Sequence, residues 1–355
     1  MEGMNFAAID IGTNAARLLI KNIDHNPLGE TKFRKVLFIR YPLRLGMDVF
    51  SKGKIGKERA EMMMRMIKGF KQMMRMYDVV DYRACATSAM RDAKNGKDLI
   101  KKIEKKTGIR IDLIEGKEEA GILYGNHIEK LPNKEGTFMY VDVGGGSTEI
   151  TLIHQGRLVG SMSYNIGTIR LLNRAVKDGI VDGLKADMAG MYANYGPINI
   201  IGSGGNINKL FRLAEEKSKK ELKLPITSLR SLHNDLQPLS VEERMDRFGL
   251  KPDRADVIVP AAEIFLIIAD CIHSDYVYVP TIGLADGIIG ELYAKAMQDE
   301  KERLSRSRFY LNAEAQGLLN AETVEGLVNF CERKKVYDER IIKKFCTFAL
   351  QMKIL

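Results

Sequence analysis

The chain has 355 residues, of which 45% are hydrophobic and 28% charged, as is ordinary for soluble globular proteins. No uncharged apolar run approaches the ~18 residues of a membrane span, and the N-terminus lacks the pattern of a secretory signal, so we expect no membrane partner. The four cysteines form no CxxC pair and the five histidines show no metal-ligand spacing, which predicts a cytoplasmic location and argues against zinc.

The formal net charge is +9. A basic balance favours a polyanionic ligand. Nucleic acid is the alternative class of polyanion, but the basic residues are dispersed among acids and no recognised DNA-binding or RNA-binding motif is present. We therefore expect no nucleic-acid partner.

The first third of the chain begins with three predicted strands at residues 6–9, 18–23 and 36–39. A loop is predicted at 40–53 and a long helix at 55–77. That helix carries seven methionines, which favours a buried core helix over a methionine-rich partner surface.

A strand at 82–86 then runs into Thr87 and Ser88, followed by Arg91. This strand end is either the second wall of a phosphate site or a serine helix cap with a solvated arginine. A helix at 97–107, stopped by Gly108, and a strand at 109–114 come next.

The helix predicted at about 115–127 opens with Glu118 and Glu119. Acids in a first helical turn are ordinarily partners of the helix dipole. The resulting order β-β-β-α-β-α-β-α describes a ribonuclease-H-like domain, the unit that recurs in actin-like folds.

The pattern restarts after residues 132–136, which predicts a second domain of the same type. Its expected elements are strands at 138–143, 150–154 and 157–162, helices from about 168, a strand at 198–201, a solvated helix at 213–224, an apolar helix at 254–275, a strand at 276–279 and a final helix that starts near 282. We predict an α/β protein with two ribonuclease-H-like (actin-like ATPase) domains around a central cleft, at 1–127 and 128–298, and a small helical C-terminal extension at 299–355.

The most informative stretch, at 140–150, reads as a short strand, three glycines, a Ser-Thr-Glu trio and a second strand. Successive N–H groups of such a glycine turn form a nest for anions, especially phosphate. The flanking acids Asp142 and Glu149 are candidate Mg²⁺ ligands, because carboxylates beside phosphates usually hold that ion or orient water. A plain hairpin turn is the alternative.

Residues 7–18 repeat the theme: a strand delivers Asp10, then Gly12 and Thr13, then a second strand. Two such units predict a duplicated domain that holds phosphate between its halves, with Asp10 and Asp142 facing each other. A third loop, Gly202-Ser203-Gly204-Gly205, leads into a helix whose N-terminus is able to bind an anion.

With these residues placed, the chain resembles the exopolyphosphatase / guanosine pentaphosphate phosphohydrolase (Ppx/GppA) family over about residues 4 to 295. The resemblance rests on the stretches DIGTNAARL, ATSAMRDAKNG, EGKEEAGILYG, VDVGGGSTEI, IGSGGNI and RADVIVP. It departs from the family pattern at Ala15, Ala261, Ala285 and Asp286, where Ser, Gly and a GLRxG-like motif are usual.

The resemblance implies release of phosphate from polyphosphate or from pppGpp, with Glu119 as the base. We expect Asp142 to be a second catalytic carboxylate, and Asp142, Glu149 and Asp10 to hold Mg²⁺ or Mn²⁺. The residues expected to bind phosphate are Thr13, Asn14, Arg17, Arg91, Gly144, Gly145, Gly146, Ser147 and Gly204. A homodimer is common in the family. A sugar or acetate-type kinase and a non-enzymatic polyphosphate or nucleotide sensor are the alternatives.

Overall fold

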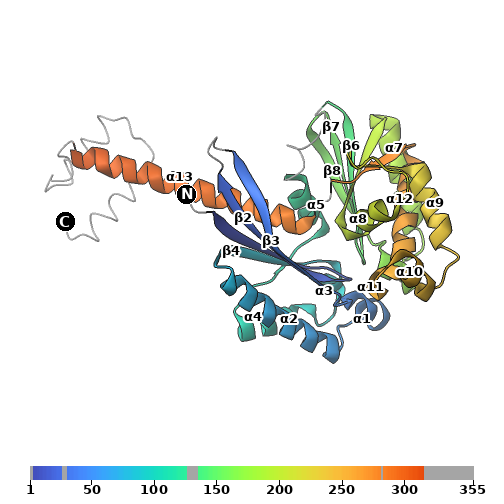
Figure 1. The fold of residues 1–355 in the computed structure, drawn as a ribbon, viewed down its shortest axis with the longest axis horizontal. Coiled ribbons are helices and arrows are strands. Elements are labelled where there is room, and N and C mark those ends of the chain that lie inside the picture. Colours follow the sequence, from blue (N-terminus) through green and yellow to red (C-terminus); the bar gives the residue numbers. More distant parts are fainter. Residues whose placement is uncertain (1–2, 26–29, 126–134, 281–282, 316–355) are drawn as a thin grey trace. The chain divides into compact units, whose positions relative to one another are not determined.

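The computed structural model describes residues 3–25, 30–125, 135–280 and 283–315 (Figure 1). The chain divides into two compact units, Met1–Tyr293 and Ala294–Leu355. The first unit contains two mixed sheets with helices packed on them. Over the described ranges, no helix combines the length and apolar character that crossing a membrane requires.

The first sheet has the strand order β3-β2-β1-β4-β5. Strands β1 (Met4–Ile11), β2 (Ala16–His25) and β3 (Thr31–Tyr41) form an antiparallel meander. Strands β4 (Val79–Ala86) and β5 (Asp112–Leu113) continue the sheet parallel to β1. Strand β5 is shorter than the strand predicted at 109–114.

The second sheet repeats this order as β8-β7-β6-β9-β11, with β10 added at the edge. Its strands are β6 (Thr137–Val143), β7 (Thr148–His154), β8 (Arg157–Tyr164), β9 (Ile198–Ser203), β10 (Lys223–Pro225) and β11 (Tyr276–Tyr278). Strands β6 to β8 are antiparallel, whereas β9 and β11 run parallel to β6. The repeated order confirms the predicted duplication.

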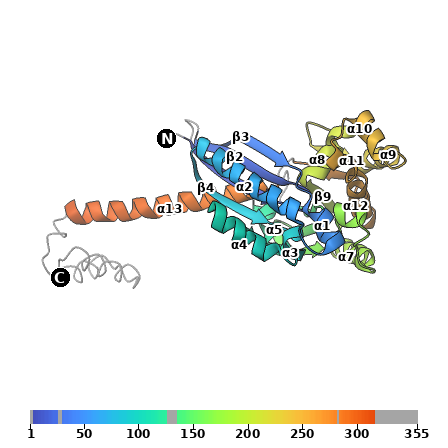
Figure 2. The same cartoon turned by 90° about the horizontal axis from the view of Figure 1, so that it is seen from below.

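The helices described in the first half are α1 (Leu45–Lys52) and α2 (Lys57–Met76) between β3 and β4, α3 (Ser88–Asp92) and α4 (Gly96–Thr107) between β4 and β5, and α5 (Gly116–Gly125) after β5. The loop predicted at 40–53 was wrong, because Leu45 and Val49 are buried on one side of α1. Helices α2 and α4 pack side by side (Figure 2). Met63, Met66 and Met74 of α2 are buried in the core, as predicted.

The second half contributes α6 (Thr168–Leu172), α7 (Ile180–Tyr195), α8 (Gly204–Leu213), α9 (Ile226–Leu236), α10 (Val241–Phe248), α11 (Pro252–Ala255), α12 (Ile258–Cys271) and α13 (Leu284–Ala315). The solvated helix predicted at 213–224 was wrong: helix α8 ends at Leu213, and β10 pairs antiparallel with β11 instead. The apolar helix predicted at 254–275 is α12, preceded by the short α11. Residues 316–355 of the predicted C-terminal extension lie outside the described residues.

Candidate functional site

The loop after β1 and the glycine loop after β6 meet closely. A Cβ atom on Gly145 would stand 2.9 Å from Cγ2 of Thr13 and 3.4 Å from the backbone nitrogen of Asn14. A Cβ atom on Gly146 would stand 2.5 Å from Oγ of Ser88, whose hydroxyl lies 2.7 Å from Oγ1 of Thr13. The glycines therefore allow loops from both sheets to approach one another, as predicted.

The carbonyl groups of the glycine loop accept hydrogen bonds from α6, which fix the position of the loop. The N–H groups of Thr168 and Ile169 at the start of α6 donate to the carbonyls of Gly144 and Gly145, at 3.0 and 2.8 Å. Nε of Arg170 donates to the carbonyl of Gly146 at 2.8 Å. In the part of the chain that the structure describes, the N–H groups of Gly145, Gly146 and Ser147 have no hydrogen-bond partner. Such free, successive N–H groups are what an anion nest requires.

Gly167 borders this nest and was missed by the sequence reasoning, because a lone glycine between a strand and a short helix is a common turn signal. A Cβ atom at Gly167 would stand 2.6 Å from the backbone nitrogens of both Gly146 and Ser147. Because Gly167 has no side chain, the space beside the nitrogens of Gly146 and Ser147 stays open.

Four carboxylates from both halves gather near these loops. Asp10 is the next-to-last residue of β1 and accepts a hydrogen bond from Nη1 of Arg17. Burial raises the pKa of Asp142 to about 6, with Arg17 opposing the rise and Asp10 adding to it. The mutual influence of Asp10, Arg17 and Asp142 agrees with the predicted approach of the two Asp-x-Gly units across the molecule.

Glu149 is the second residue of β7 and is 4% exposed. Burial raises its pKa to about 7, although hydrogen bonds from the hydroxyls of Ser147 and Ser163 oppose the rise. Oγ of Ser163 donates to Oε1 of Glu149 at 2.9 Å. The carboxylate is therefore held in place by two hydroxyl donors in a site that disfavours its charge.

Glu119 lies in the first turn of α5 and is 9% exposed. Burial raises its pKa well above the usual range, and the charges of Glu149, Asp142 and Asp10 raise it further, whereas Arg91 lowers it. Its Oε2 atom is buried and has no hydrogen-bond partner among the described residues. A buried carboxylate oxygen without a donor is costly unless a ligand, an ion or water serves it.

Two predicted phosphate ligands have protein partners that orient them. Nδ2 of Asn14 donates to the carbonyl of Asp253 at 3.0 Å, whereas its Oδ1 is buried and has no partner in the described ranges. Nη1 of Arg91 donates to the carbonyl of Ile114 at 2.8 Å. Its Nε also forms a 3.7 Å ion pair with Oε2 of Glu115, and its charge lowers the pKa of Glu119 against the larger effect of burial.

Gly204, at the start of α8, lies against Asp142. Its φ of +90° suits glycine, and a Cβ atom there would stand 2.4 Å from Oδ1 of Asp142. Oγ of Ser203 donates to Oδ2 of the same carboxylate at 3.4 Å. The N-terminal end of α8, whose dipole favours negative charge, thus already has a carboxylate of the protein beside it.

Arg254 and Arg40 join Arg17 in a cluster that the sequence reasoning did not assign. Burial lowers the pKa of Arg254 to about 9, and the charges of Arg40 and Arg17 add to this effect. A Cβ atom on Gly205 would stand 2.4 Å from Nη2 of Arg254 and 3.5 Å from Nη2 of Arg17. Arginines that crowd together in this way are suited to a multivalent anion.

Two residues that differ from the family pattern have structural roles in this chain. Ala261 is fully buried in the core of the second half. Oδ2 of Asp286 accepts a 3.0 Å hydrogen bond from the N–H of Gly283 just before α13, and Oδ1 forms a 2.6 Å ion pair with Nζ of Lys21. These residues therefore contribute packing and ion pairing.

A protein cage for a metal ion is not formed by the described residues, since no group of three His, Cys, Asp or Glu side chains is placed to hold one. Mg²⁺ usually needs only one or two carboxylates, with waters and substrate phosphates completing its shell. The raised pKa values of Asp142 and Glu149 and the unpartnered Oε2 of Glu119 mark a surplus of buried negative charge. The donor set therefore fits a hard divalent cation.

A family model matches this chain: that of the Ppx/GppA phosphatase family covers residues 28–296. The chain belongs to this family. Exopolyphosphatase 1 of Mycobacterium tuberculosis is 25% identical over 281 residues, which are 73% of this chain and 79% of that protein. A guanosine-5'-triphosphate,3'-diphosphate pyrophosphatase of Photobacterium profundum is 23% identical over 350 residues, which are 93% of this chain and 68% of that protein.

A bifunctional 3-dehydroquinate synthase/phosphatase of Fusobacterium nucleatum is 28% identical over 296 residues, 77% of this chain. The chain spans 44% of the length of that relative. A Ppx/GppA family member of Aquifex aeolicus has a similar structure, with a TM-score of 0.65, 25% identity, and coverage of 82% of this chain and 99% of that one. An exopolyphosphatase of Cytophaga hutchinsonii shares the fold, with a TM-score of 0.71, 22% identity, and coverage of 81% and 97%. These matches confirm the resemblance and the predicted two-domain α/β fold.

Proposed function

We propose that the protein hydrolyses a terminal phosphoanhydride bond and releases phosphate, either from inorganic polyphosphate or from pppGpp to give ppGpp. Relatives named for both activities support this proposal. The observation that carries it is the buried Glu119 carboxylate, whose Oε2 has no partner among the described residues and whose pKa is raised by burial and further by carboxylates of the second half. An acid held in this way is suited to be a general base.

In the proposed step, the oxygen of a water molecule bonds to the terminal phosphorus as the bridging P–O bond breaks. The electron pair of that bond leaves with the shortened chain, and the proton of the attacking water passes to Glu119. The free N–H groups of Gly145, Gly146 and Ser147 would receive the oxygens of the transferred group. Arg17, Asn14 and Arg91 would hold neighbouring phosphates.

Asp142, Glu149 and Asp10 are the residues proposed to hold Mg²⁺ or Mn²⁺. When bound, the ion neutralises phosphate charge and fixes the geometry of the terminal phosphate. Of the three, Asp10 is already paired with Arg17, whereas the hydrogen-bond donors to Asp142 and Glu149 within the described part of the chain are hydroxyl groups. We therefore place the ion chiefly on Asp142 and Glu149.

The choice between polyphosphate and pppGpp depends on groups beyond the terminal phosphate, which is common to both. The arginine cluster of Arg17, Arg40 and Arg254 would favour several linked phosphates over an isolated one. A homodimer, a cytoplasmic location and the absence of a nucleic-acid partner stay predictions from the sequence and the resemblance.

Phosphate release from long polyphosphate, tripolyphosphate and pppGpp, measured side by side with Mg²⁺ and without an acceptor, tests the proposal. Release from at least one substrate supports a phosphohydrolase. Transfer of phosphate only when a sugar or acetate is added would instead support a kinase. Tight binding without turnover of any substrate would support a sensor.

A further inference from the structure

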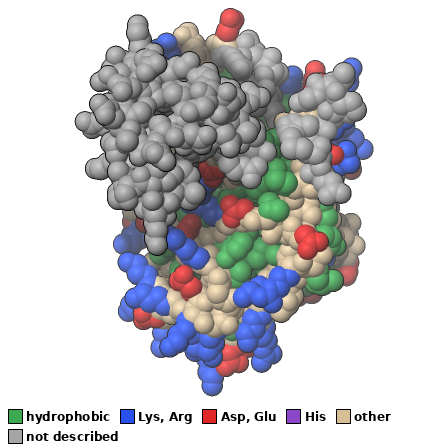
Figure 3. Space-filling view, turned by 90° about the vertical axis from the view of Figure 1, so that its left-hand side faces the viewer, with side chains coloured by type: hydrophobic (Ala, Val, Ile, Leu, Met, Phe, Trp, Pro, Cys, Tyr) green, Lys and Arg blue, Asp and Glu red, His purple; other side chains and the backbone are tan. Residues whose placement is uncertain are grey.

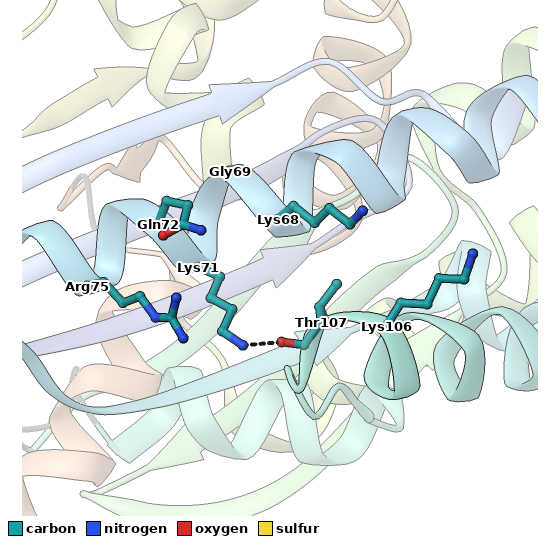
Figure 4. Close-up of a pocket in the computed structure, with 7 residues that line it drawn as sticks. All are labelled: Lys68, Gly69, Lys71, Gln72, Arg75, Lys106 and Thr107. Atoms are coloured by element: carbon teal, nitrogen blue, oxygen red, sulfur yellow. Dashed lines mark hydrogen bonds between the residues drawn. The ribbon is translucent and has the colours of Figure 1, made fainter.

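A second basic site lies between α2 and α4, apart from the residues assigned to catalysis. A pocket of about 390 Å³ is lined there by Lys68, Gly69, Lys71, Gln72, Arg75, Lys106 and Thr107 (Figure 4). Four of the seven lining residues are cationic and none is acidic.

The surrounding helices concentrate the charge of the protein. Helix α2 has six basic and two acidic residues, and α4 has five and two, so together they carry +7 of the formal net charge of +9. Lys and Arg side chains also gather at the lower end of the face in Figure 3. Within the described ranges, the side chains of Lys68, Arg75 and Lys106 form no ion pair or hydrogen bond.

This arrangement of charges destabilises α2 when no ligand is bound. Lys68, Lys71 and Arg75 are spaced three and four residues apart on α2, so like charges are neighbours on one helix face, which costs about 0.2–0.5 kcal/mol per pair. Gly69, in the middle of the same helix, costs about 1 kcal/mol relative to alanine. A Cβ atom there would meet nothing within 4 Å, so the missing side chain leaves the pocket more open.

The C-terminal end of α4 explains part of the cluster. Nζ of Lys71 donates to the carbonyl of Thr107 at 2.5 Å, and Lys106 lies in the last turn, where cations complement the helix dipole (Figure 4). Lys68 and Arg75 make no such contact with any residue that the structure describes, and they extend the positive surface along α2. An anionic ligand accounts for all four cations, whereas helix capping accounts for two.

We propose that this pocket binds a short run of linked phosphates, as a second site for the class of anion that the protein is proposed to hydrolyse. The ligand class rests on the proposed function, whereas the site itself rests on the charge and shape of the α2–α4 pocket. Linked phosphates present several negative oxygens at short intervals, which matches cations from two adjacent helices. A free polyphosphate and the triphosphate of a nucleotide share this chemistry.

The test is calorimetric titration of the full-length Glu119→Gln protein with tripolyphosphate. We expect two binding sites, one of which weakens at least tenfold in Lys68→Ala/Arg75→Ala. Gly69→Glu, which adds a carboxylate to the pocket and removes no cation, should cause the same loss. Lys101→Ala/Lys102→Ala removes two exposed cations of α4 outside the lining and should change affinity less than twofold. Thermal melts establish that each variant is folded.

Titrations with GTP, inorganic phosphate and a single-stranded oligonucleotide complete the experiment. Equal affinity for GTP and tripolyphosphate supports recognition of the phosphate run alone, and tighter GTP binding supports a nucleotide as its source. A single binding site, equal weakening in the Lys101/Lys102 control, binding of inorganic phosphate as tight as that of tripolyphosphate, or tighter binding of an oligonucleotide would each overturn the proposal. Failure of the proposed function is seen separately, as absent phosphate release by the unmodified enzyme.

Discussion

Glu118 and Glu119 are neighbours in the first turn of α5, yet their carboxylates lie in opposite environments. Oε1 of Glu118 accepts a 2.6 Å hydrogen bond from Nη2 of Arg83, and its side chain is 47% exposed. Glu119 is 9% exposed, with an unpartnered buried oxygen in the described structure. Because successive helical residues point about 100° apart, only one of the two faces the glycine loop.

Glu119→Gln tests the assignment of the base. The substitution keeps the size of the side chain but removes its capacity to accept a proton, so kcat should fall by roughly 10²–10⁴-fold. Substrate binding should be unchanged or tighter, because a negative charge near a polyanion is lost. Phosphate-release kinetics, with equilibrium binding of the same substrate, separate the two effects.

Glu118→Gln is the matched control. Arg83 keeps its contacts with Asp112 and Glu291, both at 3.2 Å, so this exposed substitution should leave kcat within about twofold and stability within about 0.5 kcal/mol. Near-normal turnover by Glu119→Gln, or loss of turnover in Glu118→Gln, would show that the base is misassigned.

Glu149→Gln tests the buried charge through the pH dependence of stability. The pKa of Glu149 is about 7 in the folded protein, above its ordinary value of 4.5, so the folded state binds more protons between these values. The associated stability is present below pH 4.5 and is lost as pH rises through 7. Without divalent ions, Glu149→Gln should therefore stabilise the protein at pH 8 by about 3 kcal/mol, because the pKa rise from 4.5 to about 7 costs ~1.4 kcal/mol per unit, and by less at pH 5.

Thermal melts at pH 5 and pH 8 in a metal-free buffer measure this difference. Glu115→Gln, whose parent side chain is 74% exposed, should shift stability by less than about 0.5 kcal/mol at either pH. A Glu149→Gln protein that is less stable than wild type at pH 8 would show that its hydrogen bonds with Ser147 and Ser163 outweigh the cost of the buried charge.

The fold was largely predictable because apolar, β-branched runs indicate the strands of each half and glycines indicate its turns. The duplication follows from the two Asp-x-Gly units and is seen in the equal strand orders of the two sheets. The failures have a common cause. Helix α1 and the loop before β10 depend on tertiary packing, such as burial of Leu45 and Leu224, that local composition does not reveal.

The site was predictable where it is built from glycine loops and was missed where distant residues complete it. Arg254 and Arg40 come from α11 and β3 and meet Arg17 only in the fold. Gly167 is separated from the glycine loop by the β7–β8 hairpin. Arg40 lies opposite Arg17 in the pairing of β2 with β3, whereas Arg254 reaches Arg17 from the second half. No spacing rule connects these positions, because their approach depends on strand register, on the packing of α6 against the glycine loop and, for Arg254, on how the two halves meet.

Divalent ions should be required for turnover. Burial, with a smaller contribution from neighbouring carboxylates, raises the pKa of Asp142 to about 6 and that of Glu149 to about 7, and a bound Mg²⁺ or Mn²⁺ would offset the negative charge of these groups. Activity should vanish with EDTA, return with either ion and survive a zinc-specific chelator. Mg²⁺ should also raise the Tm of the substrate-free enzyme at pH 8, and less so in Asp142→Asn. Full turnover after exhaustive metal removal would contradict this requirement.

Gly167→Ala tests the anion nest directly. The new Cβ atom would stand 2.6 Å from the nitrogens of Gly146 and Ser147, closer than van der Waals contact permits, so the loop must shift. We expect kcat/KM for phosphate release to fall by at least tenfold, with about 1–3 kcal/mol of lost stability. Gly160→Ala on β8 meets nothing within 4 Å and should leave both quantities nearly unchanged. Wild-type kinetics in a folded Gly167→Ala protein would exclude these N–H groups as the phosphate site.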